Sequence, residues 1–198
     1  MNEQEDTKGK VVIISGPSGV GKSTICKEAV KQLDNTYLSV SATTRQKSES
    51  EVDGQDYWFI SEEQFQERID NGLLLEYAEV FGNLYGTPRD RVDEALAAGK
   101  TVILEIDVQG ARQAKAIYPD AKMIFIFPPT HKELAARMNQ RGREDAEMAE
   151  ERLELADDEM AAAWQYYNNM VINDKLEQAV REVVQIIQEN IGDKEKND

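Results

Sequence analysis

A buried strand that leads directly into a glycine-rich turn is the feature that most restricts how this chain folds. Residues 11–14 form an unbroken apolar run, which is typical of a strand covered on both faces. The chain continues as Gly16-Pro-Ser-Gly-Val-Gly-Lys-Ser23 and matches the pattern G-x-x-x-x-G-K-S/T. A helix is expected from about residue 22 to residue 33. Strand, turn and helix therefore follow in the order that a phosphate-binding loop (P-loop) requires.

This loop predicts a site for the phosphates of a nucleoside triphosphate. Its glycines allow backbone N–H groups to surround a phosphate, and the start of the following helix adds a favourable dipole. Lys22 is expected to reach the β- and γ-phosphates, and the Ser23 hydroxyl is expected to coordinate Mg²⁺. GTPases, ATPases, transporters and kinases share the pattern, so it identifies the ligand but not the reaction.

Strand and helix patterns alternate along most of the chain, which indicates an α/β fold with a mostly parallel sheet. Further buried strands are predicted at residues 101–107, 123–127 and 170–172, and a closing helix at about 175–191. Another helix is expected to begin with Thr87 as its N-cap and Pro88 as its first residue.

Composition narrows the classes of partner. The 198 residues carry 38 acids against 23 Lys and Arg, a formal charge of −15, which disfavours binding along a nucleic-acid backbone. No apolar run is long enough to span a membrane, and the polar N-terminus does not resemble a secretory signal. The single cysteine, Cys26, fits a reducing compartment. We therefore expect a cytoplasmic protein with no nucleic-acid polymer or membrane as partner.

Two carboxylates lie near the end of the strand predicted at residues 101–107. Glu105 and Asp107 lie two residues apart, so they are expected to share one face of the strand. Ligands of open α/β sheets gather beyond the carboxyl ends of the strands. These carboxylates are candidates for holding Mg²⁺, directly or through water, or for holding a base. An ordinary charge pair at a strand end is the alternative.

Residues 41–86 and 137–163 interrupt the alternation and are interpreted as inserted lobes. The first contains a short strand near residues 57–60 and a helix opened by a capping box at Ser61. It offers the phosphate donors Arg45, Tyr57 and Tyr85 and the base-reading groups Ser41, Glu76 and Thr87. A buried carboxylate such as Glu76 favours guanine, whose N1–H and exocyclic amine both donate, over adenine, whose N1 accepts.

The second insert carries arginines that are candidates for neutralising a transferring phosphoryl group. Arg137 and Arg141 are spaced i,i+4 and share a helical face. Arg152 lies on the apolar side of its predicted helix, a position typical of a cation that points into a cleft. Surface ion pairs with the nine acids of residues 144–159 are the alternative interpretation.

Taken together, these residues resemble the guanylate kinases in order and spacing over most of the chain. The resemblance is carried by residues 16–24, 39–45, 51–57, 82–86, 103–110 and 171–174, and by Glu76, Pro128, Pro129, Arg137, Arg141, Gly142 and Arg152. It implies an ATP:GMP phosphotransferase, a nucleoside-monophosphate kinase that uses Mg²⁺ and is a monomer or homodimer. A non-catalytic guanylate-kinase-like binding module, a nucleotide-sensing module and a kinase for another acceptor are the alternatives.

The resemblance also implies roles for single residues. The catalytic residues would be Lys22, Arg137, Arg141 and Arg152. The ATP site would comprise Gly16, Ser18, Gly19, Gly21, Lys22, Ser23, Thr24 and Asn173. The GMP site would comprise Ser41, Arg45, Tyr57, Glu76, Tyr85, Thr87 and Asp107.

The implied architecture is a three-layer P-loop kinase core with a nucleoside-monophosphate-binding lobe and a helical lid. The core would span residues 9–40, 87–136 and 164–191, the GMP-binding lobe 41–86 and the lid 137–163. Flexible tails are expected at residues 1–8 and 192–198.

One departure from the family pattern lies in the predicted GMP site. The family usually carries a second arginine three residues after Arg45, and this chain has Ser48 there. Lys47 lies one position earlier and lacks the planar fork of a guanidinium. Losing a charge-assisted contact costs roughly 1.5–3 kcal/mol, so we expect a weakened GMP site or a changed acceptor preference.

Overall fold

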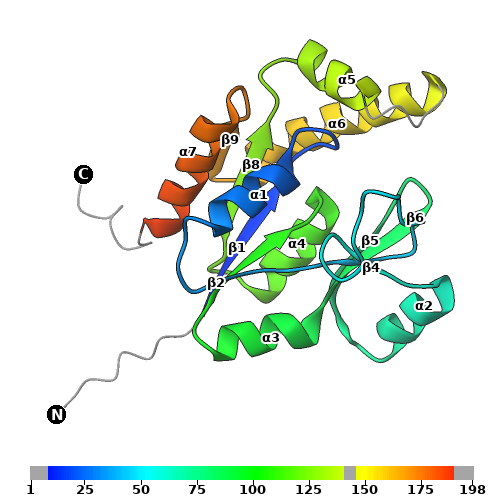
Figure 1. Cartoon of the computed structure of the whole chain (residues 1–198), viewed down its shortest axis with the longest axis vertical. Helices are drawn as coiled ribbons and strands as arrows, with labels where there is room; N and C mark the ends of the chain where they lie inside the picture. Colours follow the sequence, from blue (N-terminus) through cyan, green and yellow to red (C-terminus); the bar gives the residue numbers. More distant parts are fainter. Residues whose placement is uncertain (1–8, 141–145, 190–198) are drawn as a thin grey trace. The chain divides into compact units, whose positions relative to one another are not determined.

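The computed structural model describes residues 9–140 and 146–189 (Figure 1). The described chain divides into two compact units. The first unit contains residues 9–11 and 35–121, and the second contains residues 12–34, 122–140 and 146–189. The tails at residues 1–8 and 192–198 and the candidate residue Arg141 lie outside the described residues.

The second unit is built on parallel strands. Strand β1 (Lys10–Ser15), which begins in the first unit, pairs in parallel with β8 (Lys122–Phe127), and β8 pairs in parallel with β9 (Asn169–Ile172). Every residue of β1 after Lys10 is buried, as its unbroken apolar sequence predicts.

Helices complete the second unit. Helix α1 (Lys22–Val30) follows β1 and packs against the C-terminal α7 (Leu176–Gln188). The helices α5 (His131–Gln140) and α6 (Ala146–Tyr166) lie side by side (Figure 1).

The first unit contains a parallel pair and a small mixed sheet. Strands β2 (Thr36–Leu38) and β7 (Thr101–Glu105) are parallel. The small sheet has the order β4-β3-β6-β5, with bounds Trp58–Phe59, Ala42–Thr43, Asn83–Pro88 and Leu74–Val80. The helices of the first unit are α2 (Glu62–Asp70), α3 (Arg89–Ala97) and α4 (Val108–Ile117).

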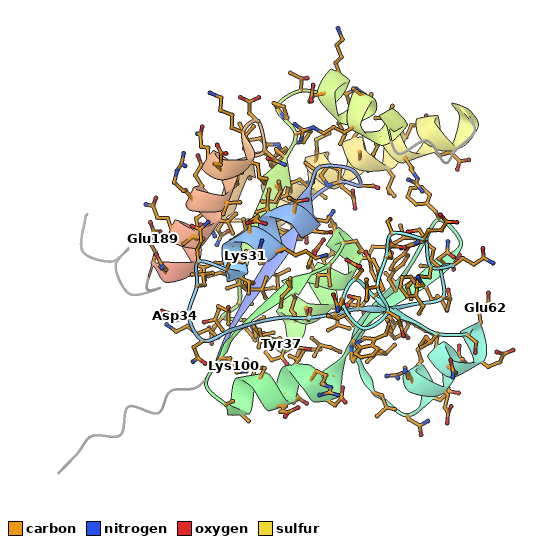
Figure 2. The ribbon with its side chains drawn as sticks, viewed as in Figure 1. Lys31, Asp34, Tyr37, Glu62, Lys100 and Glu189 are labelled. Atoms are coloured by element: carbon orange, nitrogen blue, oxygen red, sulfur yellow. The ribbon has the colours of Figure 1, made fainter. Side chains whose placement is uncertain are left out.

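A small core holds α2 onto the mixed sheet. Phe65 of α2 is fully buried against Ala42 of β3 and Leu74 of β5. Ser61 starts α2 with the predicted capping box, and the exposed Glu62 follows in the first turn (Figure 2). This packing holds α2 against β5, which carries Glu76, and against β3, which Ser41 precedes.

The fold class is confirmed, because every pairing among β1, β2, β7, β8 and β9 given above is parallel. The predicted N-cap at Thr87 is wrong. Thr87 belongs to β6, and Pro88 occupies the cap position of α3 without a side-chain cap. The shared strand face of Glu105 and Asp107 is also wrong, because β7 ends at Glu105 and Asp107 caps the next helix.

None of the helices within the described ranges combines the length and the apolar character needed to cross a membrane.

Candidate nucleotide-binding residues

The P-loop runs into α1, as its sequence predicts, and its last two residues, Lys22 and Ser23, are the first two of the helix. Gly21 is the N-cap of α1 with φ 98°, and the first turn carries no acidic residue. A Cβ at this position would lie 2.7 Å from Nδ2 of Asn173. Only glycine meets both conditions without strain. The start of α1 has neither a side-chain cap nor an acidic residue, which favours an anion there.

Lys22 folds back over the loop that precedes it. Its Nζ donates hydrogen bonds to the backbone oxygens of Gly16 and Pro17, the latter at 3.1 Å. The other predicted residues of the loop are less enclosed: Ser18 and Gly19 are half-buried, while Ser23 and Thr24 are exposed at the start of α1. The ammonium and the helix start therefore belong to one short stretch of chain.

The predicted ATP-site residue Asn173 and the predicted catalytic residue Arg137 both contact the backbone of the P-loop. Nδ2 of the buried Asn173 donates to the Val20 carbonyl at 2.7 Å. Arg137 donates from Nη1 to the same carbonyl at 3.4 Å and from Nη2 to the Asn173 carbonyl at 3.1 Å. Glu133, one helical turn before Arg137, accepts from its Nε at 3.3 Å. Arg137 and Asn173 are thus brought to the P-loop, and the half-buried Arg152 lies in α6.

Residues 9–140 and 146–189 contain no cluster of three or more His, Cys, Asp or Glu side chains that could hold an ion. The exposed Ser23 hydroxyl suits Mg²⁺, which usually takes few protein oxygens and completes its shell with phosphate oxygens and water. Asp107 is committed to capping α4: its Oδ1 accepts from Gln109 N at 2.6 Å and from Gly110 N at 3.0 Å.

A buried carboxylate lies in the first unit. Glu76 of β5 is 3% exposed, and Thr87 of β6 is fully buried and donates from its hydroxyl to Glu76 Oε1 at 2.6 Å. The pairing of β5 with β6 shifts by one residue between Leu74 and Tyr77, and three consecutive residues of β5, Leu74 to Glu76, are buried. From Glu76 onward the strand alternates as usual, with Glu76 and Ala78 buried and Tyr77 and Glu79 exposed, so Glu76 lies on the inward face of β5.

Space for this carboxylate comes from a glycine in α4. A Cβ on Gly110 would lie 2.2 Å from Glu76 Oε2, a distance that no side chain can occupy. Burial raises the pKa of Glu76 to about 7; the hydrogen bonds from Thr87 lower it, and the negative charge of Asp107 raises it. The predicted residues Glu76, Thr87 and Asp107 are therefore brought together.

The three predicted phosphate donors form a second cluster. The guanidinium of Arg45 lies over the Tyr57 ring, 5.4 Å from its centroid, and the rings of Tyr57 and Tyr85 meet edge to face at 5.8 Å. Burial raises the pKa of the Tyr57 hydroxyl, with a further contribution from the charge of Glu105. Tyr57 thus remains a protonated donor beside a cation at neutral pH. Ser41 is half-buried immediately before β3, and its carbonyl accepts from Trp58 N at 2.9 Å.

Sequence reasoning assigned no role to three features that the structure places in these clusters. They are the carboxylate of Glu51, the backbone carbonyl of Val20 and the absent side chain of Gly110. Glu51 pairs with Arg45 across an irregular loop, so no periodic spacing in the sequence indicates the pair. Val20 contributes only backbone, which carries no side-chain signal. Gly110 is a helical glycine, an unfavourable choice that could have indicated a close neighbour.

Comparisons with known proteins agree on one family. The family model for guanylate kinase matches residues 8–190. A guanylate kinase of Carboxydothermus hydrogenoformans is 46% identical over 180 residues, covering 91% of this chain and 88% of that protein. One from Synechocystis is 44% identical over 187 residues, covering 94% and 97%. The crystal structure of guanylate kinase from Anaplasma phagocytophilum superposes with a TM-score of 0.76 at 31% identity, covering 90% of this chain and 84% of that one.

Proposed function

The chain belongs to the guanylate kinase family, and we propose that it transfers the γ-phosphoryl group of ATP to GMP, yielding ADP and GDP. In this proposal the P-loop residues of the second unit hold ATP, and the clusters around Glu76 and Arg45 in the first unit hold GMP.

Guanine is read by the buried carboxylate. Ionised Glu76 accepts from guanine N1–H and from the exocyclic amine, while the hydroxyls of Ser41 and Thr87 and the carboxylate of Asp107 complete the base site. Adenine offers an acceptor at N1 instead, so it would leave the buried charge without a donor. Each hydrogen bond that the buried charge loses costs roughly 2–3 kcal/mol of binding free energy. The site therefore selects guanine.

The phosphate of GMP is held by Arg45, Tyr57 and Tyr85. A guanidinium donates in a planar fork that matches two phosphate oxygens, and the hydroxyls of the two tyrosines add further donors. These side chains already lie in mutual contact. Little reorganisation is then needed when the phosphate arrives, which reduces the entropy that binding has to offset.

ATP is held by the P-loop and its neighbours. The residues proposed for this site are Gly16, Ser18, Gly19, Gly21, Lys22, Ser23, Thr24 and Asn173. Bound Mg²⁺ would supply charge neutralisation on the triphosphate oxygens, with Ser23 as its protein ligand and Glu105 or Asp107 as partners through water. Lys22, Arg137, Arg141 and Arg152 are proposed to stabilise the negative charge that spreads over the transferring group.

Transfer needs no general base. The GMP phosphate is already anionic near neutral pH, so one of its oxygens attacks the γ-phosphorus as the bond to the bridging oxygen of ADP breaks. The protein contributes positioning and charge neutralisation. The segment 137–163 is proposed as a lid whose closure excludes water, since water would otherwise accept the phosphoryl group.

The observation that carries this proposal is the Glu76–Thr87 pair buried beneath Gly110, because such a carboxylate has a clear use in guanine recognition and none in a stable core. The test is ADP release from Mg²⁺-ATP with GMP, dGMP, AMP, CMP and UMP supplied in turn. Turnover with GMP far above that with AMP, CMP and UMP is expected. A folded protein that binds ATP but phosphorylates none of the five would contradict a catalytic role.

A further inference from the structure

Ser48 stands where the family usually has a second phosphate-binding arginine, and in the structure it contacts Glu51. Ser48 is half-buried, and it donates twice to one oxygen of Glu51. Its backbone N lies 2.8 Å and its hydroxyl 2.7 Å from Glu51 Oε2. A carboxylate oxygen held by two donors of one residue has little freedom to rotate.

Glu51 in turn holds the remaining arginine. Its Oε1 accepts from Nη2 of Arg45 at 2.7 Å and its Oε2 from Nη1 at 3.2 Å, while Nη1 also donates to the Gln46 carbonyl at 2.8 Å. These contacts use both N–H bonds of Nη1 and one of Nη2. The Nε–H and the second Nη2–H lie along another edge of the planar guanidinium, where they form a fork suited to a phosphate.

The rings of Tyr57 and Phe59 restrict Arg45 further, at 5.4 and 5.6 Å from its central carbon. The hydrogen bonds that Arg45 donates to Glu51 raise the pKa of Arg45, burial lowers it, and the neighbouring Tyr85 raises it further. The guanidinium is thus fixed at one edge by Glu51 and faces the two tyrosines that are proposed to bind the same phosphate.

Glu51 remains charged at any pH used for assay. Burial raises its pKa, but the hydrogen bonds from Arg45 and Ser48 outweigh burial and hold the pKa at about 2. Lys47, the other cation of this loop, does not take the place of the missing arginine. Its ammonium donates to the backbone oxygens of Glu51 at 2.9 Å and Ser48 at 3.4 Å and so closes the loop on itself.

We propose that Ser48 and Glu51 are positioning residues for the acceptor phosphate, and that this chain replaces a second phosphate-binding arginine by fixing the orientation of the first. The inference rests on the proposed function, since it assigns the phosphate of GMP to Arg45. Neither residue touches the phosphate; both act through the guanidinium.

The test compares GMP binding and turnover in four single variants. Ser48→Ala removes the hydroxyl contact, and Glu51→Gln removes the charge that orients Arg45. Ser50→Ala and Glu49→Gln are matched controls, because both residues are exposed in the same loop and the latter changes net charge equally. We expect the KM for GMP to rise about threefold in Ser48→Ala and about tenfold or more in Glu51→Gln. The value of kcat and the KM for ATP should stay within about twofold.

A structural role alone would not produce this split, and two further measurements exclude it. Ser48→Thr keeps the hydroxyl and is expected to restore the wild-type KM for GMP. Competition by guanosine, which lacks the phosphate, should be unchanged in every variant. An unchanged or lower KM for GMP in Glu51→Gln would overturn the inference, since it would mean that Glu51 competes with the phosphate for Arg45.

Failure of the proposed function is distinguishable from failure of this inference. If wild-type protein binds GMP by calorimetry but does not phosphorylate it, the proposed function fails, and the same variants are then compared by their dissociation constants for GMP. Equal dissociation constants in wild type, Ser48→Ala and Glu51→Gln, or no measurable GMP binding by wild type, would overturn the inference.

Discussion

Asn173 donates its side-chain amide to the Val20 carbonyl at 2.7 Å, although the two residues lie 153 positions apart. The bond ties the strand-end segment after β9 to the middle of the P-loop. Because Asn173 is buried and Gly21 leaves just enough room for its amide, the shape of the loop depends on a residue from the far end of the sequence.

Removing this amide is expected to loosen the loop. Asn173→Ala leaves the Val20 carbonyl with the longer bond from Arg137 alone, so we expect a loss of roughly 1–3 kcal/mol in the free energy of unfolding. The KM for ATP should rise severalfold. Thermal unfolding and ATP kinetics measure the two effects, with the exposed Asn168→Ala as control. An ATP affinity equal to wild type would show that the loop keeps its shape unaided.

Lys22→Ala tests the phosphate site itself. Its ammonium contacts only the loop carbonyls of Gly16 and Pro17 among the described contacts, so stability should change little. Turnover with GMP should fall at least about 100-fold, because a charge aimed at the transferring group is lost. Lys31→Ala, which removes only an exposed pair with Glu28, is the control. Activity within a few-fold of wild type would remove Lys22 from the mechanism.

The ionisation of Glu76 predicts a pH dependence of GMP binding. Its pKa is raised to about 7 in the nucleotide-free protein, and only the charged form accepts from both guanine donors. Affinity for GMP should therefore fall as the pH drops from 8 to 6, approaching tenfold per pH unit below the pKa. ATP binding should not share this fall. Calorimetric titrations at several pH values with both nucleotides measure it, and parallel behaviour of the two nucleotides would contradict the assignment.

The same raised pKa predicts that Glu76 destabilises the empty protein. A carboxyl whose pKa is higher folded than unfolded favours folding in its protonated form, so its contribution worsens as the pH rises from about 4.5 to about 7 and is constant above. Glu76→Gln should then stabilise the nucleotide-free protein at pH 8, by up to roughly 3 kcal/mol. It should also abolish measurable GMP binding. Denaturant unfolding at pH 5 and pH 8 tests the sign: the gain should be present at pH 8 and small at pH 5.

Gly110 is expected to be as necessary as the carboxylate that it accommodates. Gly110→Ala places a methyl carbon 2.2 Å from the present position of Glu76 Oε2. The carboxylate must therefore move. We expect the KM for GMP to rise at least about tenfold, since a displaced carboxylate loses one charged hydrogen bond to guanine. The KM for ATP should be unchanged. The nearby Ala111→Gly is no suitable control because Ala111 is buried, so the exposed Gln109→Ala serves instead.

The sequence alone predicted the elements whose signals are local. Three such signals each lie within a few residues: the unbroken apolar run of β1, the glycines of the P-loop and the capping box at Ser61. The structure has all three as expected. Thr87 shows the limit of such signals. Threonine before proline is a good helix start, yet the buried Glu76 claims the Thr87 hydroxyl as a hydrogen-bond donor. A tertiary contact outweighed a local preference.

Other parts of the site depend on relationships that no short pattern contains. The contact between Glu76 and Thr87 depends on the register in which β5 pairs with β6. The contact between Arg45 and Glu51 depends on the path of an irregular loop. The division of the chain into a core, a GMP-binding lobe and a lid stays a prediction, as do the roles of the single site residues, the oligomeric state and the cytoplasmic location.

The position of Lys22 has a consequence for how strongly this loop can bind any anion. The ammonium already has two carbonyl partners, so ligand entry at Lys22 is an exchange of acceptors. Hydrogen bonds that involve a charged group contribute about 1.5–3 kcal/mol, and the bonds from the ammonium to the two carbonyls already belong to this class, so each exchange yields only the gain from the negative charge of the new acceptor. A lone phosphate ion gains little by it. The loop is therefore expected to bind a molecule with several linked phosphates more strongly than a single phosphate ion.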